Sequence, residues 1–183
     1  KARARGPCVM LELKTAAEFL RASHISRWGI VQAAHRQTIA EHMYRVWLLV
    51  RSWGPVAGLD PSEQRDAELL ALMHDLPEIR TGDAPTPHKT PAVKAYLADL
   101  EEQICPDLRV IEVFASNQAS DLLKFCDTAE AALFLKVNGL GQHARDVQEL
   151  LEQQMLTRLD QSSISPANQQ ALIESFITTK HDT

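Results

Sequence analysis

The stretch Leu69–Asp83, LLALMHDLPEIRTGD, decides the fold and brings a group of ionisable side chains to the end of an apolar run. Its apolar start predicts a helix that ends in the adjacent pair His74 and Asp75, with Glu78 following. Positions three and four apart share one face of an α-helix, so Glu78 is expected beside both members of the pair. Three groups able to bind a metal or transfer a proton therefore meet at the end of an apolar helix, which predicts an active site.

Length and composition set the broad class. A chain of 183 residues with 45% hydrophobic content is long enough for one domain with a full core. No apolar run approaches the ~20 residues of a membrane span, and the net charge of −5 argues against a nucleic-acid partner, which needs a basic face. We therefore expect neither nucleic-acid nor membrane binding.

The cysteines indicate the compartment. Cys8, Cys105 and Cys126 lack metal-type spacing, and their odd number argues against a disulfide framework. Cys126 lies in an apolar helical run and is expected to be a core thiol. A reducing cytoplasm is the predicted location, which is that of the host if the chain is phage-encoded.

Helix caps and helix breakers divide the chain. Thr38 with Glu41 forms a capping box, and Asp60 with Pro61 forms a second strong helix start. No segment alternates apolar and polar residues convincingly enough to predict a strand. We expect an all-α domain over residues 10–183, a helical bundle of about seven or eight helices, after a disordered or non-native segment at residues 1–9. The predicted helices span residues 11–24, 39–53, 61–79, 91–104, 107–115, 121–137, 142–159 and 166–178.

Four potential metal ligands lie on three of these helices. His42 follows the Thr38 cap, His74 and Asp75 end the next long helix, and Asp127 lies in the segment KFCDTAEAALFLKV. Two imidazoles and two carboxylates suit a divalent transition metal such as zinc, cobalt or manganese. A lone histidine is often an ordinary core or surface residue, and a lone aspartate often faces solvent. The apolar surroundings of Asp127 favour burial, however, where an unpaired carboxylate is costly.

The order of these residues resembles the HD-domain metallohydrolases, between about Arg27 and Asp127. Within that superfamily it looks like the 5′-deoxynucleotidase branch, and closer still to the small phage members that cleave dATP. The resemblance is carried by RW at 27–28 with AEH at 40–42, HDLPE at 74–78 with TGDAPTPHK at 81–89, and KFCD at 124–127.

The resemblance implies an enzyme that cleaves dATP to deoxyadenosine and triphosphate, with metal-activated water attacking the α-phosphorus. It assigns the metal to His42, His74, Asp75 and Asp127, and it makes Glu78, beside Asp75, the catalytic acid or base. One divalent transition metal (zinc, cobalt or manganese) is implied, and a second ion such as Mg²⁺ is expected with the triphosphate. Related proteins form dimers or larger rings, so a homo-oligomer, up to a hexamer, is also expected.

Substrate contacts are expected from loops and from the helix of Asp127. A guanidinium fork suits phosphate oxygens, and lysines supply point charges; Lys124, one turn before Asp127, should point into the same cavity. An aromatic ring in a loop can stack on a base, and a neighbouring aliphatic side chain can disfavour a purine substituted at C2. An aspartate can bind the 3′-OH. The expected contacts are Arg27, Trp28, Ile30, Asp83, Lys89 and Lys124.

Other functions are compatible with parts of this pattern. A 5′-deoxyribonucleotidase acting on dNMPs would use the same ligands, and a non-catalytic helical nucleotide-binding module could keep the pocket alone. A di-iron oxygenase needs extra histidines between Asp75 and Asp127, where only His88 occurs. A guanosine tetraphosphate hydrolase has adjacent Glu and Asp after the His-Asp pair, which the run HDLPEI lacks.

Overall fold

The computed structural model describes residues 12–85 and 88–183. The expectation for residues 1–9 falls outside this range, as do Thr86 and Pro87 of the predicted substrate loop. Within it the only β-structure is a pair of isolated bridges, and seven helices have nine or more residues, which confirms the all-α prediction. The elements are α1 (Ala16–Phe19), the 3₁₀ helix η1 (Leu20–His24), α2 (Ile39–Ala57), α3 (Pro61–Met73), α4 (Glu78–Thr81), α5 (Pro91–Ile104), α6 (Pro106–Phe114), α7 (Asn117–Asn138), α8 (Gly141–Asp160) and α9 (Pro166–Asp182).

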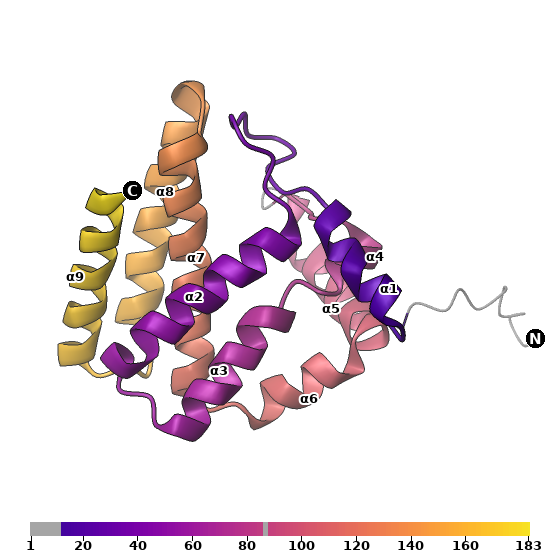
Figure 1. Cartoon of the computed structure of the whole chain (residues 1–183), viewed down its shortest axis with the longest axis horizontal. Coiled ribbons are helices and arrows are strands. Elements are labelled where there is room, and N and C mark those ends of the chain that lie inside the picture. The colour runs from indigo at the N-terminus through magenta and orange to yellow at the C-terminus, as the bar shows by residue number, and fades with distance from the viewer. Residues whose placement is uncertain (1–11, 86–87) are drawn as a thin grey trace, which may run out of the picture.

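Helix α7 lies at the centre of the bundle. It packs against α2 and α3 on one side and α8 on the other, while α9 rests on α2 and α8 (Figure 1). Phe125, Cys126 and Phe134 of α7 are fully buried. Burial raises the pKa of the Cys126 thiol well above its usual value, and the expected core thiol is confirmed. Glu130 of α7 is likewise buried at 1% exposure, whereas the Asp127 side chain is 36% exposed and lies less deeply than expected.

Helix α2 is longer than predicted. The capping box of Thr38 and Glu41 is present at its start, but the helix continues past Trp53, with Pro55 in its last turn, and ends where Gly58 adopts a left-handed φ of 82°. Pro55 has no N–H to donate to the carbonyl of Arg51, so one hydrogen bond of the helix is missing near its end. The side chains of Gln118 and Asn168 then donate hydrogen bonds to its last carbonyl, at 2.6 and 2.9 Å.

Helix α3 ends earlier than predicted, at Met73 rather than Ile79. Pro77 has no N–H to donate to the carbonyl of Met73, so the α-helical bonding cannot continue. The chain instead forms three-residue turns, in which the amides of Leu76 and Glu78 donate to the carbonyls of Met73 and Asp75, both at 3.0 Å. Glu78 therefore begins a separate helical turn, α4, and the expected continuous helix face through this residue is wrong.

The N-terminal segment is also less regular than the single helix predicted for residues 11–24. Thr15 caps the one-turn α1, which passes directly into η1. Glu18 accepts hydrogen bonds from the amides of Lys14 and Thr15 and from the Arg80 guanidinium, and these lower its pKa to about 2. The ion pair between Glu18 and Arg80 connects α1 with α4, which belongs to the segment that follows His74.

The loop between η1 and α2 is held at both ends. Ser26 and Thr38 form an antiparallel bridge at its base. Its far end is bonded to the junction of α7 and α8, where Ala33 bridges Gly139 and the Ala34 amide donates to the carbonyl of Asn138 at 2.7 Å. The loop predicted for residues 26–37 is thus a fixed arch over the end of α7.

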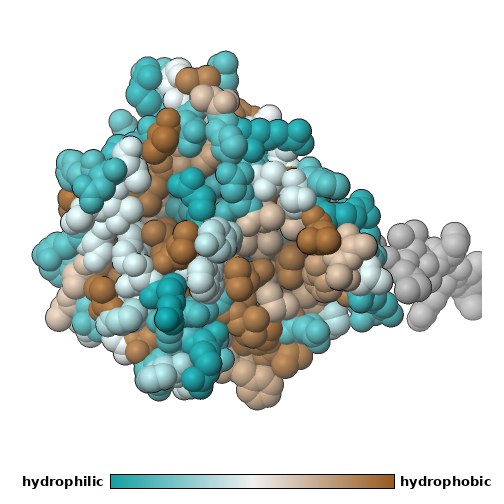
Figure 2. All heavy atoms as spheres, viewed as in Figure 1, coloured by the Kyte–Doolittle hydropathy of each residue, from teal (hydrophilic) through white to brown (hydrophobic). Residues whose placement is uncertain are grey.

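Apolar side chains remain on part of the surface. Figure 2 shows apolar side chains gathered on the face where α3 and α6 lie. The exposed large residues of these two helices are Leu69, Leu72, Val110, Val113 and Phe114. In the described part of the chain no helix combines the length and the hydropathy needed to cross a membrane.

Candidate metal centre

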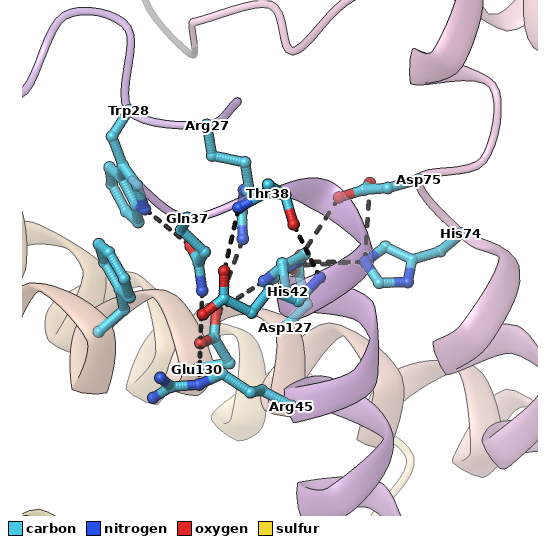
Figure 3. A network of polar contacts seen from close by, with 12 residues as sticks. Arg27, Trp28, Gln37, Thr38, His42, Arg45, His74, Asp75, Asp127 and Glu130 are labelled. Atoms are coloured by element: carbon cyan, nitrogen blue, oxygen red, sulfur yellow. Dashed lines mark hydrogen bonds and ion pairs between the residues drawn. The ribbon is translucent and has the colours of Figure 1, made fainter. Parts of the chain in front are cut away.

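The four predicted metal ligands meet at one point. His42 comes from α2 and is fully buried, His74 caps the end of α3, Asp75 follows it, and Asp127 comes from α7 (Figure 3). Nε2 of His42 lies 3.1 Å from Oδ1 of Asp127, 3.5 Å from Oδ2 of Asp75 and 3.3 Å from Nε2 of His74. Three elements distant in sequence therefore direct two imidazoles and two carboxylates at a common centre.

The hydrogen bonds around the two imidazoles determine which nitrogen of each ring faces the centre. Nδ1 of His42 contacts a carboxylate oxygen of Glu130 at 2.6 Å, and Nδ1 of His74 contacts the carbonyl of Ala71 at 3.0 Å. Both partners accept, so each Nδ1 donates and each Nε2 turns a lone pair inward. Two nitrogen and two carboxylate lone pairs then face one another, and they fit a four-coordinate cation such as zinc.

The charges around the centre shift the pKa values of His42 and Asp127 in opposite directions. Burial and the charge of Arg27 lower the pKa of His42, but the contacts with Asp127 and Glu130 and the charge of Asp75 outweigh them, so its pKa is raised. Burial raises the pKa of Asp127, but the hydrogen bond from His42 and the positive charges around it leave that pKa well below its usual range. The two effects share the contact between His42 and Asp127, because the carboxylate favours a charged imidazole and the charged imidazole favours an ionised carboxylate.

Glu78 lies beside this centre and is not one of its ligands. Burial raises its pKa, the carboxylates of Asp75 and Asp83 raise it further, and Lys89 and Arg27 counteract only part of this, leaving a pKa of about 9. Its Oε2 atom is buried and has no hydrogen-bond partner among the described residues. Burial and these charges therefore favour the protonated form of Glu78.

The arch carries Arg27 and Trp28 to the same region. Trp28 has a left-handed φ of 66°, stacks on Phe134 at 5.7 Å with the rings 3° from parallel, and donates from Nε1 to the Gln37 side chain at 2.8 Å. Nη1 of Arg27 is 3.6 Å from Oε2 of Glu130 and, in the described structure, forms no hydrogen bond. The guanidinium keeps donors free for an anion, and one face of the indole is already covered by Phe134.

The remaining predicted substrate residues differ in position. The charges of Asp83 and Lys89 both act on Glu78, which places them at the site, and Ile30 is 50% exposed on the arch. Lys124 does not point into the cavity as expected: its ammonium bonds Asp121 at 3.4 Å and its side chain is 61% exposed. A pair three residues apart on the helix surface satisfies this lysine in the absence of a substrate. Its role in binding phosphate stays a prediction.

The sequence analysis missed the buried residues behind the ligands. Glu130 is 1% exposed and accepts from Gln37, which is fully buried, and from Arg45. Phe134, one turn further along α7, supports the arch. Glu130 could have been found by the argument applied to Asp127, because it is a second acid in the same apolar helix; nothing in the sequence marked Gln37.

Comparison with known proteins agrees with this geometry. The family model for the HD domain matches residues 20–163 of the chain. A dATP triphosphohydrolase of Cyanophage S-2L is 56% identical over 92% of this chain and 97% of its own. A dATP triphosphohydrolase of Salmonella phage PMBT28 is 31% identical over 72% of this chain and 71% of its own.

A solved structure extends the match to three dimensions. It is the Cyanophage S-2L HD phosphohydrolase bound to dA and one catalytic Zn²⁺ ion, which superposes with a TM-score of 0.91 at 55% identity, covering 94% of this chain and 99% of the other. A cluster of His42, His74 and Asp75 could hold a metal ion, with Asp127 in contact with His42, and this cluster agrees with the helical fold and these matches. The chain belongs to the HD-domain family.

Proposed function

We propose that this protein hydrolyses dATP to deoxyadenosine and triphosphate with one divalent transition metal, favouring zinc, at His42, His74, Asp75 and Asp127. The observation that carries the proposal is the convergence of these four side chains beside Glu78 in a chain 56% identical to a dATP triphosphohydrolase. The zinc named for the similar cyanophage structure suits the inward-facing lone pairs, and the dA named there agrees with deoxyadenosine as the product. A second ion such as Mg²⁺ with the triphosphate stays a prediction.

A divalent ion at this centre supplies the charge that lets a water lose its proton near neutral pH and that offsets charge on a phosphoryl oxygen. Glu78 is suited to protonate the departing 5′ oxygen, because it is buried, keeps its proton at neutral pH and has an unpartnered oxygen. The free donors of Arg27 suit a phosphate oxygen. Lys89 contributes positive charge nearby, and Lys124 would do so on leaving Asp121.

The arch is proposed to select the base. Trp28 stacks on Phe134 and has the guanidinium carbon of Arg27 5.4 Å from its ring centroid, and we propose that an adenine stacks on this indole when the substrate phosphates draw Arg27 away. Ile30, half exposed two residues later, would close against the base edge and exclude a substituent at C2. Asp83, whose charge acts on Glu78, is the proposed partner of the 3′-OH.

Identification of the inorganic product tests the reaction. We expect zinc-loaded protein to release triphosphate and deoxyadenosine from dATP, as measured by ion-exchange chromatography, and to turn over dGTP at least about tenfold more slowly. Asp75→Ala, which removes one ligand, should lose both bound metal and turnover. Release of orthophosphate from dAMP with dATP left intact would replace the proposal with a 5′-deoxyribonucleotidase, and equal rates on dGTP and dATP would contradict the role of Ile30.

A further inference from the structure

The carboxylate of Glu130 is the most heavily bonded side chain behind the metal centre, although it is not one of the four ligands. Each of its oxygens faces two donors (Figure 3). Oε1 accepts from Nε2 of Gln37 at 2.8 Å and forms an ion pair with Nε of Arg45 at 2.7 Å. Oε2 accepts from Nδ1 of His42 at 2.6 Å and lies 3.6 Å from Nη1 of Arg27. A side chain with 1% exposure has no other means of satisfying these lone pairs.

We propose that Glu130 is a positioning residue that orients His42 toward the metal and, through Gln37, holds the arch that carries Arg27 and Trp28. Its first effect is to keep the proton of His42 on Nδ1, so that Nε2 stays a ligand. A carboxylate bonded to the outer nitrogen of a ligand histidine also makes the imidazole a stronger base, and loss of such partners typically lowers metal affinity by about 10–100-fold.

The second effect passes through Gln37. Its amide nitrogen donates to Glu130 while its amide oxygen accepts from Nε1 of Trp28 at 2.8 Å, and its backbone carbonyl accepts from the Arg27 amide at 3.0 Å. Glu130 therefore fixes the orientation of the Gln37 side-chain amide. That amide in turn holds the indole of Trp28, a residue whose backbone has a left-handed φ. One buried carboxylate connects the metal ligand with the residues proposed to bind the substrate.

The geometry explains why glutamine cannot replace Glu130. An amide offers one accepting edge and one donating edge, whereas both edges here face donors. In Glu130→Gln, either His42 or the pair of Gln37 and Arg45 must face an NH₂ group. The variant keeps the size and shape of the side chain, so its effects report the hydrogen bonding and charge.

Metal affinity of the folded protein tests the first effect. We expect Glu130→Gln to weaken zinc binding by about 10–100-fold in competition with a chromophoric chelator, while Glu152→Gln, which breaks a carboxylate pair with Lys180 far from the site, leaves it within twofold. Unchanged zinc affinity in folded Glu130→Gln would refute the proposal. Wild-type protein supplies a second measurement if the variant fails to fold: ¹⁵N NMR of the zinc-loaded protein should show the His42 proton on Nδ1, and a proton on Nε2 would refute it equally.

Gln37→Met tests the second effect, which rests on the proposed function. Methionine fills a similar volume but can neither hold Trp28 nor donate to Glu130. We expect zinc affinity within about threefold of wild type and a KM for dATP raised about tenfold or more with a smaller change in kcat. An unchanged KM would refute the link to the arch. Failure of the wild type to cleave dATP would instead overturn the proposed function and leave the zinc measurements on Glu130 valid.

Discussion

Glu78 has two properties with opposite consequences. Its burial beside Asp75 and Asp83 raises its pKa to about 9, which suits an acid catalyst. The same surroundings make its ionisation unfavourable in the folded protein. A carboxyl group with an unfolded pKa near 4.5 destabilises the fold progressively as pH rises from that value through about 9, because the unfolded chain releases the proton more readily.

Glu78→Gln is therefore expected to separate stability from activity. The amide cannot ionise, so in metal-free protein the variant should gain about 1–3 kcal/mol relative to wild type at pH 8, or about 2–4 °C in Tm per kcal/mol, and the gain should vanish near pH 4.5. Loss of the acid should lower kcat by about 10²–10⁴-fold. Thermal unfolding across this pH range and steady-state kinetics measure the two effects, and a stability difference independent of pH would contradict ionisation of Glu78 as its cause.

Individual residues were predictable where their chemistry is unusual for their surroundings. His42, His74, Asp75 and Asp127 stand out because polar groups in apolar helices require a reason, and the structure brings all four together. The orientation of Lys124 was not predictable, since position on a helix face does not determine which neighbour a long side chain bonds.

At the scale of elements, the junction of α7 and α8 holds the arch in place. Gly139 allows the end of α7 and the start of α8 to pack closely. A Cβ at this position would lie 2.5 Å from the carbonyl oxygen of Leu135 and 3.0 Å from Cβ of Ala144. Its bridge to Ala33 then anchors the segment that carries Trp28. The conformation of the arch thus depends on a glycine that lies far from it in sequence.

Gly139→Ala is expected to destabilise the protein by about 1–3 kcal/mol, because a backbone carbonyl cannot move aside as a flexible side chain would. It should also raise the KM for dATP, since the arch must shift. Denaturant unfolding and kinetics test both effects. Gly29→Ala is the matched control for stability, because no atom lies within 4 Å of an added Cβ there, and its change should stay within about 0.5 kcal/mol.

Helix starts were predicted better than helix ends. The caps at Thr38 and Asp60 and the prolines at 61, 91 and 166 act locally and lie where expected. The end of α2 depends on Gln118 and Asn168, side chains from other helices that close its last turn. Such contacts exist only after the bundle has assembled, so local patterns miss them.

At the scale of the whole molecule, the site joins two separate regions of the core. Val46 of α2 and Ala129 of α7 belong to one apolar cluster, and Met43 and Leu76, next to the ligands His42 and Asp75, belong to the other. The all-α class followed from the helical periodicity, but this division of the core did not, because it depends on which faces meet in three dimensions. The expected homo-oligomer stays a prediction.

A metal bound between two such regions should stabilise both. Free zinc at 100 times its Kd is expected to add about 2.7 kcal/mol, which corresponds to a rise in Tm of about 5–10 °C for a chain of this size. A chelator should reverse the rise. In Asp75→Ala, which lacks one ligand, zinc should leave Tm nearly unchanged. An equal zinc-dependent shift in that variant would place the stabilising ion elsewhere.

Pro77 affects the direction in which Glu78 points relative to the proposed metal ligands. Successive residues rotate by about 100° in an α-helix and by about 120° in three-residue turns. Over the four steps from His74 to Glu78, the tighter winding imposed after Met73 changes the azimuth of the carboxyl group by roughly 80°. A proline that lacks one amide proton therefore helps to aim the proposed acid, because the angular relation between the metal ligands and Glu78 depends on the winding of the backbone between them.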